Sequence, residues 1–379
     1  MVYLDYSATT PVKKEVLDTF VKVCNDYPGN SNSMHKLGIK SHELEVYTTN
    51  KIADLLKVKP CEIIYTSGAS ESNNLAIKGV CFKYKNRGKH IITTRLEHSS
   101  IIAPISYLVN LGYEVDFVNV NSDGLIDIKH LKSLLRDDTI LVTINAVDSE
   151  IGIRQDVEAI GKLLLEYPKC LFHVDCTQAI GKVNIDFTNI DMFSLSAHKF
   201  YGLKGIGLLV KKEKVLIEPL IHGGKSTTVY RSGTPPLPLI VSLAKALKLA
   251  LQDVLEHYDY VERLNKKIVT KLKEYDNIFI NSTSKSIPYV INFSLKRVKA
   301  ETFVHAMEMK DVYISSKSAC STSDAVSKSV MALTNDEDLA SSTLRISLSH
   351  MTTCKEINIF LQVFDDVMNN LFEVRNENN

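Results

Sequence analysis

The sequence has 379 residues and a formal net charge of +1, and 45% of its residues are hydrophobic. A chain of this length predicts two or three domains with a sizeable core. The near-neutral charge gives no support for nucleic acid or a membrane surface as the main partner. No run reaches the roughly 18 apolar residues of a membrane span, and the start shows no signal peptide.

The seven cysteines are an odd number and form no Cys-x-x-Cys pair. In a long chain without a secretory signal, this pattern is typical of free thiols in a reducing compartment. The sequence therefore predicts a cytoplasmic protein, and it predicts no metal site.

Seven short runs of apolar and β-branched residues lie in the first part of the chain, and several of the longer segments between them have a helical pattern. This alternation is typical of an α/β sheet that is largely parallel and covered on both faces. The predicted strands are Ile63–Thr66, Ile91–Thr94, Val115–Val118, Ile140–Ile144, Leu171–Val174, Met192–Leu195 and Ile206–Val210.

After Pro238 the pattern changes, because apolar residues at helical spacing predict one long helix over Leu237–Tyr258. A second, smaller α+β domain is indicated by further strands at Phe279–Ile280, Tyr289–Phe293, Val312–Ile314 and Leu344–Leu348. We therefore assign residues 14–253 to a large domain and residues 1–13 and 254–379 to a small domain.

The segment Thr66–Leu75 joins a predicted strand to a predicted helix and is rich in small residues. Small residues let backbone N–H groups approach an anion, and a helix N-terminus favours negative charge. The segment is therefore a candidate phosphate site. The alternative is an ordinary helix cap, because Ser and Asn also cap helices.

Asp175 stands at the end of a predicted buried strand, where a carboxylate is costly unless it has a partner. A protonated ring nitrogen of a cofactor is one such partner. Pyridoxal 5′-phosphate (PLP) needs such a carboxylate, because a protonated pyridine is the better electron sink. The alternative is that Asp175 caps the next helix.

Lys199 follows the predicted strand Met192–Leu195 in a segment of small residues. A lysine in such a place can be partly desolvated, which suits Schiff-base formation. A single lysine is more often a solvated surface residue. Here a Ser and a His precede it closely, and Gly202 and Gly205 follow.

Cys320 lies in Ser315–Asp324, a run of small polar residues after a predicted strand. This composition predicts an exposed loop, whereas a buried structural cysteine usually has apolar neighbours. An exposed thiol can attack a substrate and then carry a persulfide to another protein. The alternative is an incidental surface cysteine.

Together these segments resemble one family, the cysteine desulfurases of the NifS/IscS group, within the aspartate-aminotransferase-like (fold type I) PLP enzymes. One motif alone would be weak, but several in the right order are specific. The matching segments include Leu4–Pro11, Gly29-Asn30, Thr66–Ser72, Glu97-His98, Glu150–Gly152, His173–Asp175, Thr177-Gln178, His198-Lys199, Gly202, Lys204–Gly207, Arg231–Thr234, Ser318–Cys320 and Arg345–Leu348.

The resemblance implies a PLP-dependent enzyme with a large domain built on a mostly parallel seven-stranded sheet. The smaller domain would carry the catalytic cysteine loop, at about residues 315–331. The implied reaction converts L-cysteine to L-alanine and leaves the sulfur as a persulfide on an enzyme cysteine. The implied partners are a second copy of the chain and an acceptor protein, either an Fe–S cluster scaffold or a tRNA or cofactor thiolation enzyme.

The resemblance also implies residue roles around the cofactor ring. Lys199 would bind PLP covalently and move protons at the substrate α-carbon. His98 would stack on the pyridine ring and assist the proton transfer. Asp175 would pair with the ring nitrogen, while Gln178 and Ser149 would contact the ring oxygen.

Further roles concern the phosphate and the substrate. Arg345, helped by Asn30, would bind the substrate carboxylate bidentately, which a lysine does less well. Cys320 would attack the substrate sulfur. The phosphate would be held by Ala69, Ser70, Ser196, His198 and, from the other subunit of a homodimer, Thr234.

The chain departs from the family pattern at two places. Asp148-Ser149-Glu150 stands where the family usually has Asn-Asn-Glu, so Ser149 offers a shorter contact to the ring oxygen. Residues 225–230 replace a glycine-rich stretch that contains Glu-Arg. Our hypothesis is a divergent paralogue dedicated to one acceptor.

Other functions remain open from the sequence. The long loop after Ser318, running to about Met331, favours the IscS-like over the SufS-like subgroup. A selenocysteine lyase would share the fold, and an aminotransferase would leave Cys320 without a purpose. A non-catalytic PLP-binding scaffold of a sulfur-transfer complex is the alternative from another class, although a scaffold would not need to retain all of the catalytic residues: Lys199, His98, Asp175, Arg345 and Cys320.

Overall fold

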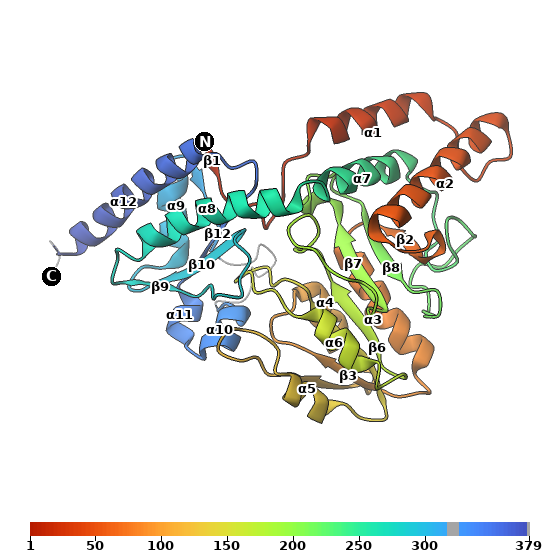
Figure 1. The fold of residues 1–379 in the computed structure, drawn as a ribbon, viewed down its shortest axis with the longest axis horizontal. Helices are drawn as coiled ribbons and strands as arrows, with labels where there is room; N and C mark the ends of the chain where they lie inside the picture. Colours follow the sequence, from red (N-terminus) through yellow and green to blue (C-terminus); the bar gives the residue numbers. More distant parts are fainter. Residues whose placement is uncertain (317–325, 377–379) are drawn as a thin grey trace.

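The computed structural model describes residues 1–316 and 326–376. Figure 1 shows two lobes of unequal size, joined where α7 (Leu237–Ala250) is followed by α8 (Val254–Leu272). Within the described residues, no helix has both the length and the apolar character needed to cross a membrane.

The larger lobe is built on a seven-stranded sheet with the strand order β2-β8-β7-β6-β5-β3-β4. Strand β8 runs antiparallel to both of its neighbours, and the other neighbouring pairs are parallel. The predicted mostly parallel seven-stranded sheet is confirmed. The strands are β2 (Ile63–Thr66), β3 (His90–Thr93), β4 (Glu114–Phe117), β5 (Thr139–Asn145), β6 (Leu171–Asp175), β7 (Met192–Ser196) and β8 (Gly207–Lys211).

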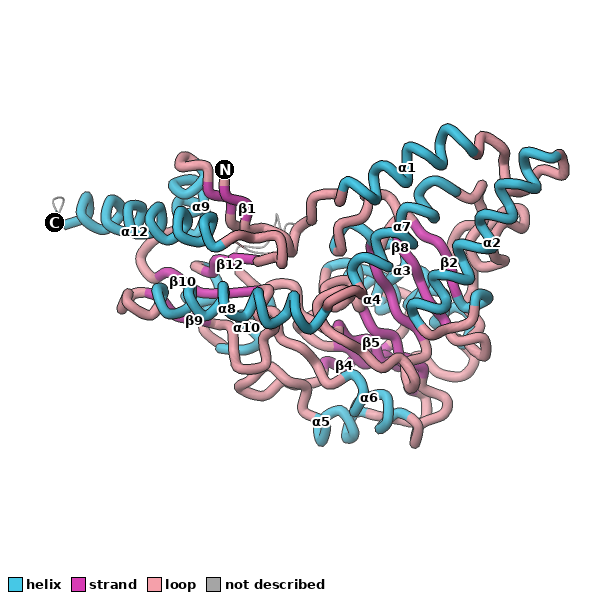
Figure 2. Tube along the Cα trace, turned by 45° about the horizontal axis from the view of Figure 1, so that its top comes forward, coloured by secondary structure: helices cyan, strands magenta, loops and turns pink. Residues whose placement is uncertain are grey.

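The central strands are buried on both faces, which explains why their sequences are continuous apolar runs rather than alternating ones. Successive side chains point to opposite faces, so Leu141 and Val142 of β5 join two different core clusters. Helices cover the two faces: α3 (Ala69–Tyr84), α4 (Ser99–Val109), α5 (Ile128–Leu134) and α6 (Val157–Leu164). At the edge of this lobe, α1 (Lys14–Asp26) and α2 (Lys36–Leu56) pack against α7 (Figure 2).

The smaller lobe has an antiparallel sheet in the order β12-β10-β9 and a parallel pair, β1-β11. Rings of Phe293, Phe303 and Phe360 pack against Phe364 in its core. The predicted α+β unit is confirmed. Its elements are β1 (Val2–Tyr3), β9 (Ile278–Ile280), β10 (Val290–Leu295), β11 (Val312–Tyr313), β12 (Thr343–Ser347), α9 (Ala300–Glu308), α10 (Lys328–Thr334), α11 (Glu337–Ser341) and α12 (Cys354–Asn376).

Two sequence-based boundaries differ from the structure. The prediction of a single helix over Leu237–Tyr258 is wrong. Asp253 adopts a left-handed conformation (φ 55°) between α7 and α8, and this conformation interrupts the helix. The loop predicted to run to Met331 ends earlier, because α10 begins at Lys328 and is capped by the Ser327 hydroxyl.

One segment joins the two lobes across the middle of the molecule. We call residues 4–11 the N-terminal strap. At one end Asp5 bridges to Ser347 of β12. At the other end the backbone N–H of Thr10 donates to the carbonyl of His198, at 2.9 Å, in the larger lobe. The strap therefore lies over the carboxyl ends of β6 and β7.

Candidate active site

A cavity of about 400 Å³ opens at the carboxyl ends of β6 and β7. In α/β sheets this edge is where ligands bind, because loops from neighbouring strands converge there. The cavity brings together ten of the residues predicted from the sequence: Ala69, Ser70, His98, Ser149, Asp175, Gln178, Ser196, His198, Lys199 and Arg345.

Lys199 ends a short 3-10 helix, Ala197–Lys199, that directly follows β7. Its Nζ donates hydrogen bonds to two backbone carbonyls of the strap, Ser7 at 2.6 Å and Ala8 at 2.7 Å. The amine is therefore oriented by contacts from the opposite wall of the cavity.

Asp175, the last residue of β6, is buried and uses both carboxylate oxygens. Oδ2 accepts a hydrogen bond from Asn73 Nδ2 at 2.8 Å, and Oδ1 accepts the backbone N–H of Thr177 at 2.9 Å. Asp175 thus caps the following turn and also lines the cavity. The two interpretations that were open from the sequence are compatible.

His98 caps α4, and its Nδ1 accepts the backbone N–H of Ser100 at 3.1 Å. The hydroxyl of Ser100 also accepts from Asn73, which ties His98 into the same network as Asp175. Burial lowers the pKa of His98, the Lys199 amine acts in the same direction, and Asp175 opposes it. A neutral imidazole is favoured, and because Nδ1 accepts from Ser100 its proton lies on Nε2.

The other end of the cavity fits an anion. Gly68 precedes α3 with φ 155°, and a Cβ there would lie 3.3 Å from Ser196 Oγ and fill the space. The first N–H groups of α3, at Ala69 and Ser70, have no partner within the helix, and both residues line the cavity. Burial lowers the pKa of His198 to about 4, and the positive charges of Lys199 and Lys204 act in the same direction.

Several buried polar atoms at the cavity have no hydrogen-bond partner within the described residues. They are Asn145 Oδ1, Thr177 Oγ1 and Arg345 Nε. Buried polar atoms are nearly always satisfied in folded proteins, so the cavity is suited to a polar molecule. A pyridine ring with a phosphate fits a site that has an amine, a buried carboxylate and a helix N-terminus.

Arg345 reaches the cavity from β12 of the smaller lobe and is buried. Its Nη1 donates to the carbonyl of Ser149 at 2.9 Å, and its Nη2 donates to Asp5 Oδ1 at 2.8 Å. A guanidinium has five N–H donors, so the described contacts leave donors for a substrate carboxylate.

Two predicted site residues of the described chain, Thr234 and Asn30, do not line this cavity. Thr234 is exposed and lines a neighbouring cavity of about 260 Å³. Asn30 is exposed, and its side chain accepts the backbone N–H of Asn32 at 2.9 Å. Cys320 lies outside the described residues.

Four other polar residues of the site were not predicted from the sequence: Asn73, Ser100, Asn145 and Thr177. Asn73 lies in the segment Thr66–Leu75, which was a candidate phosphate site or helix cap, and its side chain contacts Asp175. A buried polar residue on an apolar-periodic helix was the signal that could have identified it. The strap carbonyls are backbone atoms and give no residue-type signal.

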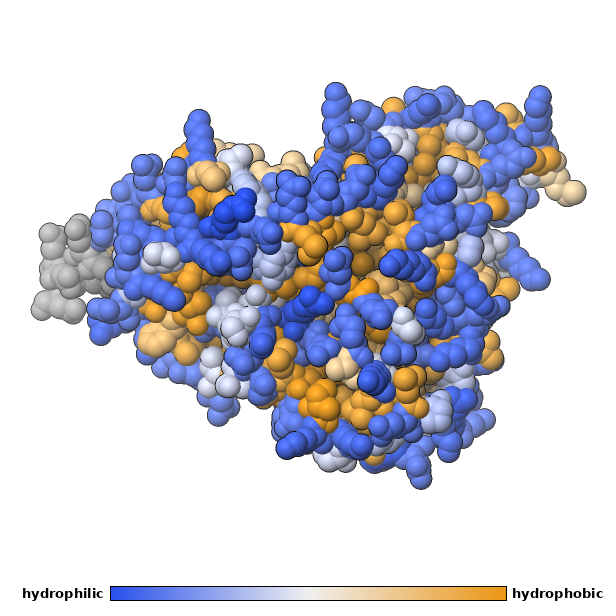
Figure 3. Space-filling model, in the orientation of Figure 1, coloured by the Kyte–Doolittle hydropathy of each residue, from blue (hydrophilic) through white to orange (hydrophobic). Residues whose placement is uncertain are grey.

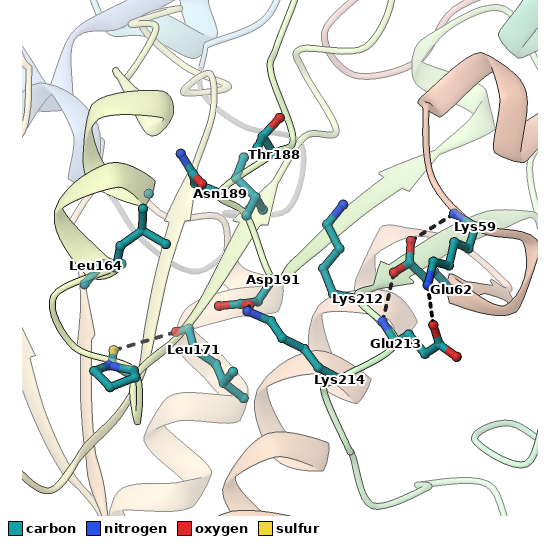
Figure 4. A pocket seen from close by; sticks show the side chains of 15 residues that line it. Lys59, Glu62, Leu164, Leu171, Thr188, Asn189, Asp191, Lys212, Glu213 and Lys214 are labelled. Carbon is teal, nitrogen blue, oxygen red and sulfur yellow. Dashed lines mark hydrogen bonds and ion pairs between the residues drawn. The ribbon is translucent and has the colours of Figure 1, made fainter.

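A larger cavity, of about 650 Å³, lies at the opposite edge of the sheet (Figure 4). There the charged side chains pair with one another, Lys59 with Glu213 at 2.5 Å and Lys214 with Asp191 at 2.9 Å. It lies at the amino ends of β6 and β7, away from the converging loops. We therefore place the active site in the smaller cavity.

Comparison with known proteins agrees with this geometry. A family model described as "Aminotransferase class-V" matches residues 2–360. A "NifS/IcsS protein homolog" of Lactobacillus delbrueckii subsp. bulgaricus is 39% identical, with 97% of each chain covered. A "Cysteine desulfurase IscS" of Dictyoglomus turgidum is 36% identical, with 98% of this chain and 95% of that protein covered.

Solved structures are similar over the same length. One named "NIFS-LIKE PROTEIN" has a TM-score of 0.92 and 32% identity, with 97% of this chain and 99% of that chain covered. Another, "SspA in complex with cysteine", has a TM-score of 0.82 and 33% identity, with 93% and 100% covered.

Proposed function

The chain belongs to the class-V aminotransferase family, and on this basis we propose that it is a PLP-dependent cysteine desulfurase. The observation that carries the proposal is one cavity lined by Lys199, His98, Asp175 and Arg345. The enzyme converts L-cysteine to L-alanine and passes the sulfur on for Fe–S cluster assembly. The relatives reported above support this reaction and give no support to a selenocysteine lyase or a scaffold.

Bound PLP supplies an electron sink for the bond changes at the substrate α-carbon. Lys199 holds the cofactor through Nζ and later moves a proton at the α-carbon. The carboxylate of Asp175 keeps a proton on the ring nitrogen, and Asn73 keeps that carboxylate in place. His98, whose pKa is lowered by burial, stacks as a neutral ring and assists the proton transfer.

We propose the remaining cofactor contacts for residues that line the cavity. Ala69 and Ser70 offer backbone N–H groups, and Ser196 and His198 offer side chains, to the phosphate. Gln178 and Ser149 contact the ring oxygen. We assign the substrate carboxylate to Arg345, helped by Asn30.

Cys320 is the proposed sulfur acceptor within the enzyme, an assignment that rests on its sequence setting. Its thiolate attacks the substrate Sγ, and a new S–S bond forms while the Cβ–Sγ bond breaks. The substrate Cβ keeps the electron pair of that bond and takes up a proton. The products are therefore alanine and a persulfide on Cys320, and no external oxidant is needed.

We propose a homodimer, in which Thr234 of one subunit reaches the phosphate of the other. Two features support the dimer. Thr234 is exposed and does not line the active-site cavity of its own subunit, and α1 and α2 expose apolar side chains. Leu17, Leu37 and Tyr47 are 46%, 53% and 60% exposed. Figure 3 shows apolar atoms among hydrophilic ones on this upper right part of the surface.

We also propose that the acceptor is a separate protein, either an Fe–S scaffold or a thiolation enzyme, and that the protein acts in the cytoplasm. The cysteines that the structure describes are all free thiols, which supports a reducing compartment. We further propose that residues 14–253 form the large domain and that residues 1–13 and 254–379 form the small domain.

The test is a steady-state assay of the purified protein with L-cysteine and a reductant. We expect alanine and sulfide in near-equal amounts, and we expect both to disappear in Lys199→Ala and Cys320→Ala. Selenocysteine is assayed in parallel. Alanine formed only from selenocysteine would support the lyase instead, and bound PLP without any turnover would support the scaffold.

A further inference from the structure

Lys182 is a buried lysine that the reaction described above does not use. It lies in the loop after β6, four residues beyond Gln178, and is only 8% exposed. Its Nζ donates a hydrogen bond of 2.6 Å to Gln178 Oε1, and it forms no ion pair with any described residue. A buried lysine without a carboxylate partner is costly, so its retention calls for a function.

Two further hydrogen bonds lead from Gln178 to the reactive amine. Gln178 Nε2 donates to the backbone carbonyl of Ser7 at 2.9 Å. The same carbonyl accepts from Lys199 Nζ at 2.6 Å. A carbonyl oxygen has two lone pairs, and both are occupied here. Lys182 is thus connected to Lys199 through one side chain and one strap carbonyl.

Lys182 determines which end of the Gln178 amide faces the carbonyl of Ser7. The two ends of an amide side chain are nearly equal in size, but one donates and the other accepts. The ammonium form of a lysine can only donate to it, so protonated Lys182 keeps Gln178 Oε1 turned toward itself and leaves Nε2 facing Ser7. If the amide turned over, Oε1 would oppose the carbonyl of Ser7, and two acceptors would meet.

We propose that Lys182 is a positioning residue of this active site, which fixes the Gln178 amide and, through it, the strap carbonyl that holds Lys199. The inference deepens the proposed function and rests on it for the role of Lys199. The charged groups that face Lys182 are Lys199 and Arg345. Burial lowers the pKa of Lys182 to about 7, and the charges of Lys199 and Arg345 act in the same direction. The Lys182 amine can donate to Gln178 Oε1 in either protonation state.

The test replaces Lys182 by Met, which keeps the length of the side chain and removes the donor. The matched control is Lys211→Met. Lys211 is also buried, in β8, where its Nζ lies over the Tyr230 ring, and it does not line the active-site cavity. The control measures the effect of losing any buried lysine from this lobe.

The first readout is trace acylation of Lys199 in the PLP-free protein, followed by mass spectrometry of the peptide that contains it. We expect Lys199 to react about fivefold faster in Lys182→Met, the factor that corresponds to one lost hydrogen bond. We expect no change in Lys211→Met. Gln178→Met should give the same increase, and adding Lys182→Met to it should give no more.

The second readout is the dissociation constant of PLP, which we expect to rise by a similar factor in Lys182→Met and to stay unchanged in Lys211→Met, because the displaced Gln178 amide also loses its proposed contact with the ring oxygen. Unchanged acylation in both Lys182→Met and Gln178→Met would overturn the proposal. So would an equal increase in Lys211→Met, or additive effects in the double variant. Because acylation needs no turnover, it separates this proposal from the desulfurase assay, which can fail independently.

Discussion

The Nζ of Lys199 donates a 2.6 Å hydrogen bond to the backbone carbonyl of Ser7, which lies 192 positions earlier in the chain. The contact joins the end of β7 to the N-terminal strap. Since the strap also pairs with β12 through Asp5 and Ser347, one segment links the amine to the strand that carries Arg345. The N-terminal strap therefore connects Lys199, the proposed cofactor-binding residue, to the strand of Arg345, the proposed substrate-binding residue.

The proposed covalent role of Lys199 predicts a specific chemical product. After borohydride reduction of the PLP-loaded enzyme, the cofactor mass should stay on the peptide that contains Lys199. In Lys199→Ala no peptide should retain it, and alanine production should fall by roughly 1000-fold or more. Lys204→Ala, which removes another lysine of the cavity, should keep the attachment. Attachment to a different lysine would contradict the assignment.

The charge of Asp175 should matter more than its shape. Asp175→Asn keeps the size of the side chain but removes the negative charge that would face the ring nitrogen. We expect kcat to fall by about 100-fold or more with a small change in KM, because the lost interaction acts in the transition state. The control is Asp191→Asn at the opposite edge of the sheet, which should retain kcat. Similar losses in both variants would argue for a structural effect.

The guanidinium of Arg345 should set the affinity for the substrate carboxylate. Arg345→Lys keeps the positive charge but loses the planar pair of donors. We expect KM for L-cysteine to rise about 10- to 100-fold, with a smaller change in kcat, as measured by the rate of alanine formation. The exposed Arg154→Lys should leave KM unchanged. A normal KM in Arg345→Lys would place the carboxylate elsewhere.

Glu97 should make folding stability depend on pH. Burial raises the pKa of this carboxyl to about 8, while Thr94 and the backbone N–H of Asn145 partly oppose that shift. Between the unfolded pKa near 4.3 and about 8, the folded protein binds a proton that the unfolded chain has lost. The free energy of unfolding therefore falls as pH rises through this window, by up to about 1.4 kcal/mol per pH unit.

The measurement is denaturant unfolding of the wild type and Glu97→Gln at mildly acidic and mildly alkaline pH. Because glutamine imitates the protonated carboxyl, the variant should lose less stability than the wild type on going to alkaline pH. The exposed Glu43→Gln is the control and should behave like the wild type. An equal pH dependence in Glu97→Gln and the wild type would show that Glu97 is ionised in the folded protein.

The sequence predicted the sheet well, because its buried parallel strands are short continuous apolar runs such as Leu171–Val174. It failed at Leu237–Tyr258, where apolar residues keep helical spacing across the break at Asp253. Periodicity reports which residues are buried and cannot detect one left-handed residue between two helices.

The site was predictable where chemistry resides in the residue type, as for Lys199, Asp175 and Arg345. It was not predictable where chemistry resides in the backbone, as for the carbonyls of Ser7 and Ala8. Lys182 was missed for a related reason, since its function depends on what Gln178 contacts rather than on its own type.

The most direct test of the central claim is a single-turnover experiment with L-cysteine, without reductant, in which alanine and the mass of the Cys320 peptide are measured together. We expect one alanine for each added sulfur atom, located on Cys320. In Cys320→Ala neither product should form, although the variant should still bind PLP. Alanine without added sulfur on Cys320, or sulfur on another cysteine, would contradict the account.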